Sequence, residues 1–226
     1  GAYLSAGRGP ILETKLPWST SSSSKSNTLN QKSDYYVNEI DYISSKSCDA
    51  NTILAIKKNL TEYGAMGAVI YAESPTYVSD DKLAYYYNGS KSINHALTII
   101  GWDDDYSASN FKTTPKGNGA WLTKDTYPTI FTGNSTIPAG YHYVSYYDTN
   151  ICASLMSAYK VEAASFDNKY TNNIHGFSGN IKTTDTSSII FKNIYTKQNN
   201  ASEKISKVNI FTGYPGDKYE IYYSDV

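Results

Sequence analysis

The first clear periodic pattern along the chain is helical. From about Asn51 to Tyr63, apolar side chains recur every three or four residues, at Ile53, Ile56, Leu60 and Tyr63. This spacing places them on one face of a helix. Asp49 or Asn51 can cap the first turn, and Gly64 can adopt the left-handed conformation that ends a helix. The pattern therefore predicts one amphipathic helix in this part of the chain.

Four short apolar stretches follow the helix and have the length and residue types of β-strands: Gly67–Ala72, Ala96–Trp102, Ala120–Lys124 and Tyr141–Tyr147. The last stretch alternates with a period of two. One helix followed by a run of strands predicts an α+β fold with an antiparallel sheet. Residues 1–46 carry no such pattern and are expected to be mostly irregular, with a loop at the Ser-rich tract Ser19–Ser26.

After Asp148 the pattern changes to short strand-like segments separated by turn residues: Ser157–Ala163, Ser187–Tyr195, Ile205–Thr212 and Lys218–Tyr223. No helical period is visible there. This texture predicts an all-β, sandwich-like segment that is shorter than a complete sandwich. We therefore expect two regions: residues 1–155, which contain the helix and the first sheet, and residues 156–226.

The overall composition excludes several classes of protein. The 226 residues include 20 basic and 21 acidic side chains, with no basic cluster, which argues against a dedicated nucleic-acid binder. No run approaches 18 apolar residues, so we expect no membrane span. Two cysteines are too few for a four-Cys zinc site or a disulfide framework. The 23 tyrosines, together with a polar remainder that is largely Ser, Thr and Asn, favour strands and turns. An aromatic-rich composition with Lys rather than Arg and few cysteines is typical of bacterial secreted or wall-associated proteins.

Three histidines are the candidates for acid–base chemistry. His95 stands at the start of an apolar strand, where a rigid scaffold can hold an imidazole at a cleft edge; it can equally be a core histidine bound to a backbone group. His142 alternates with tyrosines and is interpreted as a packing or surface residue, and His175 as a polar loop residue. No pair of histidines has the spacing of a zinc-binding helix, so we expect no metal catalysis.

Asp125 is the candidate partner for His95. It follows the apolar strand 120–124 directly. If the strands of His95 and Asp125 pair, the carboxylate can accept a hydrogen bond from the imidazole Nδ1–H and fix its tautomer, as the third member of a catalytic triad does. The alternative is a turn carboxylate at a strand end. Both interpretations are open at this stage.

Two segments resemble the sequence signatures of papain-family cysteine peptidases. Asn94–Asp103 is similar to the family's Asn-His-Ala-Val-x-Ile-Val-Gly-Trp-Asp, which contains the catalytic His, and Gly119–Thr126 is similar to Gly-Ala-Trp-Ile-Val-Lys-Asn-Ser, which contains the Asn that orients it. The resemblance extends to further segments, namely Tyr63-Gly64, Ala68–Tyr71, Tyr85–Gly89 and Gly140–Asp148. It implies that His95 and Asp125 are catalytic and that Trp102 and Trp121 pack around the site.

The resemblance is strongest to bacterial wall-associated enzymes in which a lectin-like β domain follows the peptidase. Residues from about 165 to 226 resemble the start of such a domain. This implies a secreted or cell-surface protein, with protein or peptide substrates and cell-wall glycan as a further partner. No cofactor is expected, except that calcium in the lectin-like segment is implied by the resemblance alone.

The family's nucleophile has no match in this chain. The family carries Gly-x-Cys-Trp on an early helix with an oxyanion Gln before it, whereas Ala2–Pro10 resembles the stretch that follows that helix. We therefore expect an upstream segment of the same protein to supply the Cys and the Gln. Cys48 precedes the predicted helix in a region far from the family's His, and Cys152 is expected to be buried. The sequence leaves open whether the two cysteines form a disulfide.

The departures from the family signature leave three hypotheses. Asp125 replaces Asn and is a stronger acceptor that supports a thiolate–imidazolium pair, whereas Thr126-Tyr127-Pro128 replaces Ser-Trp-Gly and removes a shielding Trp. The first hypothesis is the His-bearing half of a cysteine endopeptidase. The second is a catalytically inactive papain-like scaffold that binds wall glycan or protein. The third, a Ser-His-Asp hydrolase, lacks a Gly-x-Ser-x-Gly motif and is remote.

Overall fold

The fold is described from a computed structural model of the chain. The residues that it describes are 4, 9–17, 33–73, 76–79, 82–126, 140–163, 165, 168–171, 190, 192–197, 202–208, 210 and 218–224. The chain divides into two compact units. One contains residues 39–160, and the other contains residues 1–38 and 161–226. The predicted loop at Ser19–Ser26 and the candidate His175 lie outside the described residues.

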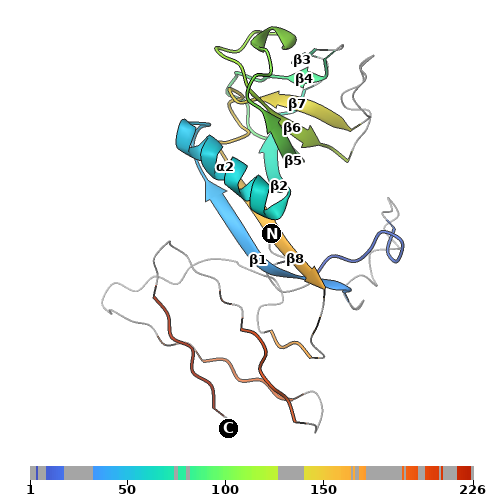
Figure 1. The fold of residues 1–226 in the computed structure, drawn as a ribbon, viewed down its shortest axis with the longest axis vertical. Helices are drawn as coiled ribbons and strands as arrows, with labels where there is room; N and C mark the ends of the chain where they lie inside the picture. Colours follow the sequence, from blue (N-terminus) through green and yellow to red (C-terminus); the bar gives the residue numbers. More distant parts are fainter. Residues whose placement is uncertain are drawn as a thin grey trace. The chain divides into compact units, whose positions relative to one another are not determined.

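The predicted helix is confirmed as α2, which spans Ala50–Tyr63. The carboxylate of Asp49 accepts a hydrogen bond from the backbone N–H of Thr52, so Asp49 is the N-cap. Gly64 adopts a left-handed conformation with φ of 84°, and its N–H donates to the carbonyl of Leu60. Ile56 and Leu60 are buried, as the apolar spacing predicted. The helix packs across the strands beside it (Figure 1).

The described strands form one eight-stranded sheet in the order β1-β8-β2-β5-β6-β7-β4-β3. Four strands confirm the sequence prediction: β2 (Met66–Ile70), β5 (His95–Asp103), β6 (Ala120–Lys124) and β7 (Tyr141–Ser145). These four are consecutive in the sheet, and each pairs antiparallel with the next. Helix α2 lies over β2 and β5, which gives the α+β architecture that the pattern predicted.

Three strands occur where the sequence pattern predicted none. The strand β1 covers Tyr35–Ser44, so the expectation that residues 1–46 are mostly irregular is wrong for this stretch. The short strands β3 (Val78–Ser79) and β4 (Ala84–Tyr85) were also missed. Strand β4 pairs in parallel with β7. Polar residues interrupt the apolar alternation of β1, and its neighbour β8 is more than 100 residues away in sequence, so the pairing leaves no local signal.

The strand β8 covers Leu155–Ala163 and continues the first sheet. Met66 and Gly67 of β2 are in register with Ala158 and Ser157 of β8. Residues 155–160 therefore belong to the unit that contains α2, although the sequence pattern assigned residues from 156 onward to the second region. The division into regions of residues 1–155 and 156–226 stays a prediction.

The described residues after position 163 contain no helix and no strand. The strand predicted at Lys218–Tyr223 is therefore absent, and those at Ser187–Tyr195 and Ile205–Thr212 are absent wherever these ranges are described. A strand needs a neighbouring backbone to complete its ladder, and no such pairing occurs among these residues. Side chains do link parts of the segment, because the hydroxyl of Tyr170 donates to Glu203 at 2.8 Å. The sandwich-like arrangement stays a prediction.

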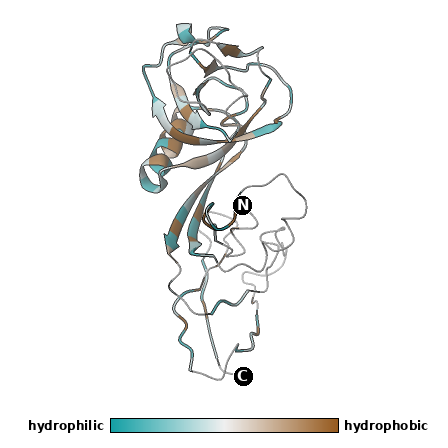
Figure 2. Ribbon diagram, turned by 90° about the vertical axis from the view of Figure 1, so that its right-hand side faces the viewer, coloured by the Kyte–Doolittle hydropathy of each residue, from teal (hydrophilic) through white to brown (hydrophobic). Residues whose placement is uncertain are grey.

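The core of the unit 39–160 lies between α2 and the sheet. Ile56 of the helix and Met66, Ile99 and Trp121 of the strands are fully buried in one apolar cluster. Hydrophobic positions on the helix and strands are brown in Figure 2 and alternate with hydrophilic positions along the ribbons. Burial of this cluster, at roughly 25 cal/mol per Å² of apolar surface, holds the sheet rigid beneath the candidate site.

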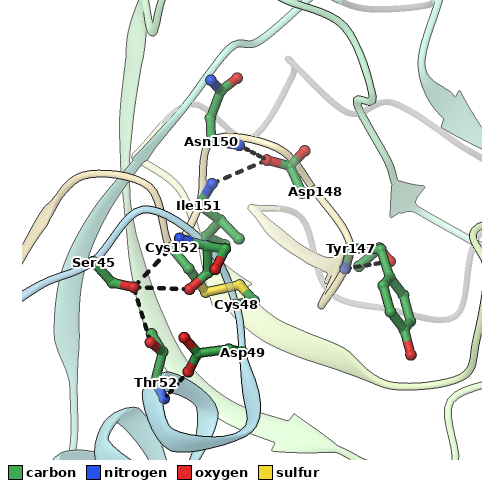
Figure 3. Close-up of a disulfide and its surroundings, with 11 residues drawn as sticks. Ser45, Cys48, Asp49, Thr52, Tyr147, Asp148, Asn150, Ile151 and Cys152 are labelled. Atoms are coloured by element: carbon green, nitrogen blue, oxygen red, sulfur yellow. Dashed lines mark hydrogen bonds between the residues drawn. A yellow bond between two sulfur atoms is a disulfide. The ribbon is translucent and has the colours of Figure 1, made fainter.

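A disulfide links the segment before helix α2 to the segment that joins β7 and β8. Cys48, just before α2, is bonded to Cys152, which follows β7, with 5.1 Å between their Cα atoms (Figure 3). The pairing that the sequence left open is therefore formed. Asp148 organises the turn that carries Cys152, because one carboxylate oxygen accepts from the backbone N–H groups of Asn150 and Ile151. The other oxygen accepts from the N–H of Tyr87 at 3.0 Å.

Candidate active site

His95 is the first residue of β5, and its backbone is positioned by the neighbouring strand β2. It is in register with Ile70, the last residue of β2. The preceding Asn94 fastens this end of the sheet, because its side chain accepts from the backbone N–H of Ala72 and donates to the carbonyl of the same residue. The side chain of His95 is 15% exposed, so its imidazole lies at the boundary between the sheet and solvent.

Asp125 directly follows β6, and its backbone is held by a hydrogen bond to the segment before β7. Its N–H donates to the carbonyl of Gly140, at the start of β7, at 2.7 Å. Its side chain is 1% exposed. Because β5 and β6 run antiparallel, the first residues of β5 and the last residues of β6 lie at the same end of this strand pair. The pairing on which the His95–Asp125 hypothesis depended is therefore present.

The side chains of His95 and Asp125 contact each other at this end of the strand pair. His95 Nε2 and Asp125 Oδ2 are 2.5 Å apart. The sequence interpretation expected the contact at Nδ1, whereas in the structure the contact is made at Nε2. A hydrogen bond between an imidazolium and a carboxylate is charge-assisted and stronger than one between neutral groups. With Nε2 directed at Asp125, Nδ1 is the ring atom through which His95 would exchange a proton with a nucleophile.

An open hollow lies beside His95. It has a volume of about 360 Å³ and is lined by Val69, Ile93, Asn94, His95 and Ala96. The lining combines apolar side chains with the imidazole and one amide. A concave, mostly apolar surface next to an acid–base group is the kind of site that holds a substrate segment while the polar group acts on it.

His142 belongs to the same cluster and was not selected from the sequence. It is the second residue of β7, is fully buried, and lies opposite Thr123 of β6. Burial lowers the pKa of His142 to about 3, with the Asp125 charge opposing and the His95 charge adding to the shift. His142 is therefore neutral at physiological pH. One signal was present in the sequence: His142 shares its parity with Val144, an apolar position of the same strand.

The two tryptophans do not surround this site. Trp102 lies at the far end of β5, seven residues or about 23 Å along an extended strand from His95. It is 39% exposed, with the Lys57 ammonium over its ring. Trp121 is fully buried and packs on Tyr146. The expectation that both tryptophans pack around the site is wrong, because Trp102 and Trp121 are register partners at the opposite end of the strand pair.

Other candidate residues in the described part of the chain have structural roles or form no site. Both cysteines of the sequence are in the disulfide, so neither Cys48 nor Cys152 carries a free thiol here. Within the described ranges, no group of three or more His, Cys, Asp or Glu side chains could hold a metal ion. No helix among the described residues is both long and apolar enough to cross a membrane. Tyr127 and Pro128, which replace the family's Trp-Gly, lie outside the described part.

Two solved structures of Cwp84 from Clostridium difficile resemble this chain. One is the Clostridial cysteine protease Cwp84 after propeptide cleavage, with 27% identity and a TM-score of 0.58 over 72% of this chain and 40% of that chain. The other contains the cysteine protease and lectin-like domains of Cwp84, a surface-layer-associated protein, with 27% identity and a TM-score of 0.57 over 72% and 36% of the chains. The chain has a papain-like cysteine-protease fold.

A plant enzyme shows a weaker likeness. The bromelain protease from Ananas comosus, solved with the E64 inhibitor, has 17% identity and a TM-score of 0.46, over 71% of this chain and 66% of that chain. No protein-family model and no curated protein matches the sequence. The chain spans well under half the length of the two Cwp84 chains.

Proposed function

We propose that this chain is the His-bearing half of a cysteine endopeptidase, and that an N-terminal segment of the same protein supplies the nucleophilic Cys and the oxyanion donor. The observation that carries the proposal is the contact between Nε2 of His95 and Oδ2 of the buried Asp125, which are 2.5 Å apart. This pair lies at the ends of β5 and β6, beside an open hollow. The Cwp84 likeness supports the same assignment.

The proposed roles follow from the geometry of the pair. His95 Nδ1 takes the thiol proton, and the resulting thiolate attacks the carbonyl carbon of the peptide bond. The C–N bond then breaks, and His95 returns the proton to the leaving amine. In the second half, His95 removes a proton from water, and the oxygen of that water attacks the acyl-enzyme carbonyl. The C–S bond then breaks, and His95 returns the proton to the departing thiolate, which releases the carboxylic acid and restores the thiol. Asp125 keeps Nε2 protonated and the ring oriented throughout.

The location and the partners extend the same proposal. Cwp84, to which this chain is similar, is a surface-layer-associated protein with a cysteine protease domain and a lectin-like domain. By analogy, this chain acts on protein substrates at the surface of a bacterium, and residues from about 165 begin a lectin-like segment that binds cell-wall glycan. Calcium in that segment is carried over from the resemblance alone.

The test uses the native protein that contains this sequence. Wild-type protein and the His95→Ala variant are compared for cleavage of an unfolded protein substrate, with His175→Ala as the same chemical change elsewhere in the chain. We expect His95→Ala to lower kcat by at least about 100-fold, because general acid–base catalysis contributes 10²–10⁴. The His175→Ala variant should cleave at the wild-type rate, and circular dichroism should show both variants folded.

Thiol labelling separates the peptidase from an inactive scaffold. A thiol alkylator at neutral pH should modify one cysteine other than Cys48 and Cys152, as intact-mass analysis would show, and should abolish cleavage. A native protein with no further cysteine, or a His95→Ala variant as active as the wild type, would contradict the proposal. The papain-like scaffold would then be tested for binding of wall glycan or protein without cleavage.

A further inference from the structure

His142 occupies a defined place beneath the His95–Asp125 pair. In the sheet, Ile99, Thr123 and His142 are register partners across β5, β6 and β7. Register partners direct their side chains to the same face, as do residues two apart on one strand. Asp125 lies two residues beyond Thr123, and His95 lies four residues before Ile99. The side chains of His95, Asp125 and His142 therefore share one face at one end of the sheet.

The distances of a β-sheet place Asp125 and His142 within reach of each other. Because Thr123 is opposite His142, Asp125 is the diagonal neighbour of His142, at roughly 7–8 Å between Cα atoms. That separation lets an imidazole on one strand approach a carboxylate on the next. The backbone at this point is fixed, because the hydroxyl of buried Thr123 donates to the carbonyl of His142 at 2.9 Å.

Burial orders the three groups from the core to the surface. His142 is 0% exposed as a residue, whereas the side chains of Asp125 and His95 are 1% and 15% exposed. Asp125 contacts His95, the most exposed of the three, and its charge acts on His142, the most buried. Burial holds the pKa of His142 low, so it stays neutral and does not compete with a protonated His95 as a second cation on the same carboxylate.

An imidazole at this position has a cost that an apolar side chain would not have. Burying a polar ring without need costs free energy, and a leucine or phenylalanine would fill the same space beside Val144. A neutral imidazole, by contrast, is a polar ring that interacts electrostatically with the neighbouring Asp125 without adding charge. The residue type is therefore matched to the neighbouring Asp125 rather than to the apolar core.

From this geometry we propose that His142 is a positioning residue that supports the Asp125 carboxylate from the core side and so fixes the orientation of His95. The catalytic meaning of this inference rests on the proposed peptidase function. The support of Asp125 is a property of the fold and can be measured without catalysis. His142 acts through Asp125 and touches no substrate.

The test combines an NMR readout with kinetics on the native protein. With ¹⁵N-labelled histidine, the shifts of the two ring nitrogens of neutral His95 report its tautomer, and signals are assigned with single His variants. We expect His142→Phe to redistribute the His95 tautomer and lower kcat by about 10- to 100-fold with little change in KM, since small misplacements cost this much. His142→Gln, which keeps a polar side chain, should restore most of both.

Val144→Ala is the matched control, because Val144 is equally buried on the same face of the same strand. It should lower the midpoint of thermal unfolding and leave the His95 tautomer unchanged. A folded His142→Phe variant with the wild-type His95 tautomer would overturn the inference.

A reciprocal measurement applies if His142→Phe does not fold. In the nearly isosteric Asp125→Asn variant, the ring ¹⁵N shifts of His142 should move; if they stay at wild-type values, the inference is also overturned. Failure of the peptidase proposal gives a different result. In that case His95→Ala would leave the cleavage activity unchanged, whatever the His95 tautomer in the other variants.

Discussion

At the scale of single residues, the site differs from the papain-family signature in using a carboxylate where the family has an amide. The carboxylate of Asp125 is nearly completely buried and is 2.5 Å from His95 Nε2. A carboxylate accepts a hydrogen bond more strongly than an amide does, and it carries a charge that complements an imidazolium. Asp125 can therefore act through charge as well as through orientation, and substitution separates the two.

We expect Asp125→Asn to retain activity within about tenfold, because the amide oxygen still accepts from Nε2, whereas Asp125→Ala should lose about 100-fold or more. Steady-state cleavage kinetics of both variants check this, with circular dichroism as the folding control. Equal losses in Asn and Ala would mean that the charge, and not the orientation of the ring, is what the site requires.

Asp148 is a second residue whose environment has a measurable consequence. Burial raises its pKa from 3.8 to about 6, although the backbone N–H groups of Asn150, Tyr87 and Ile151 partly offset the effect. The folded protein then binds this proton more tightly than the unfolded chain does. The contribution of Asp148 to the free energy of unfolding should therefore fall as the pH rises from about 4 to about 6.

The carboxyl ¹³C signal of Asp148 should accordingly titrate with a midpoint near 6. Asp49 provides the contrast, since its hydrogen bond from Thr52 N–H lowers its pKa below 3.8, and its stabilising contribution is lost only as the pH falls through that lower value. Asp148→Asn should remove the part of the pH dependence between 4 and 6. A titration midpoint near 4 for Asp148 would contradict the prediction.

At the scale of elements, two glycines with positive φ illustrate different constraints. Gly64 ends α2 with φ of 84°, and a Cβ there would meet no atom within 4 Å. Gly119 precedes β6 with φ of 108°, and a Cβ there would lie 2.4 Å from Cδ2 of Tyr146. The first position is constrained by the backbone alone, whereas the second is constrained by the backbone and by packing.

Gly64→Ala should therefore lower the free energy of unfolding by about 1 kcal/mol, the cost of a left-handed conformation. Gly119→Ala should lower it by about 3 kcal/mol or more, because the overlap with the buried Tyr146 ring adds to that cost. Urea denaturation of the two variants measures the difference. Equal values would mean that the loop before β6 relaxes around the added methyl group.

At the scale of the whole molecule, the disulfide joins segments that are 104 residues apart in the sequence. A cross-link over such a long loop removes much of the conformational freedom of the unfolded chain. It also ties the start of α2 to the turn that Asp148 organises (Figure 3). The disulfide thus lies within the same compact unit as His95 and Asp125.

We expect the Cys48→Ser/Cys152→Ser double variant to lose about 2–4 kcal/mol of unfolding free energy relative to the oxidised protein. Chemical denaturation with and without a reductant measures this, and the double variant should not respond to the reductant. The contact between His95 and Asp125 should persist in the folded variant, since it depends on the β5–β6 pairing. An unchanged unfolding free energy would show that the bond adds no net stability.

Local patterns in the sequence were sufficient to predict the features that depend on neighbouring residues. Helical spacing and the capping residues Asp49 and Gly64 placed α2, and apolar runs placed four central strands, because helix and strand periodicities are written in neighbouring residues. The position of His95 at a strand start and of Asp125 at a strand end was also readable. These local signals were enough to nominate the pair.

The contacts between residues far apart in the sequence became visible in the folded structure alone. In the folded chain, Asp125 contacts Nε2 rather than Nδ1 of His95, and His142 is buried near this pair. Cys48 is bonded to Cys152, and the two tryptophans lie at the opposite end of the β5–β6 pair. Strand order and register set these contacts, and they arise from pairings between segments far apart in the chain. The energy of such pairings depends on both partners at once, so neither segment alone records it.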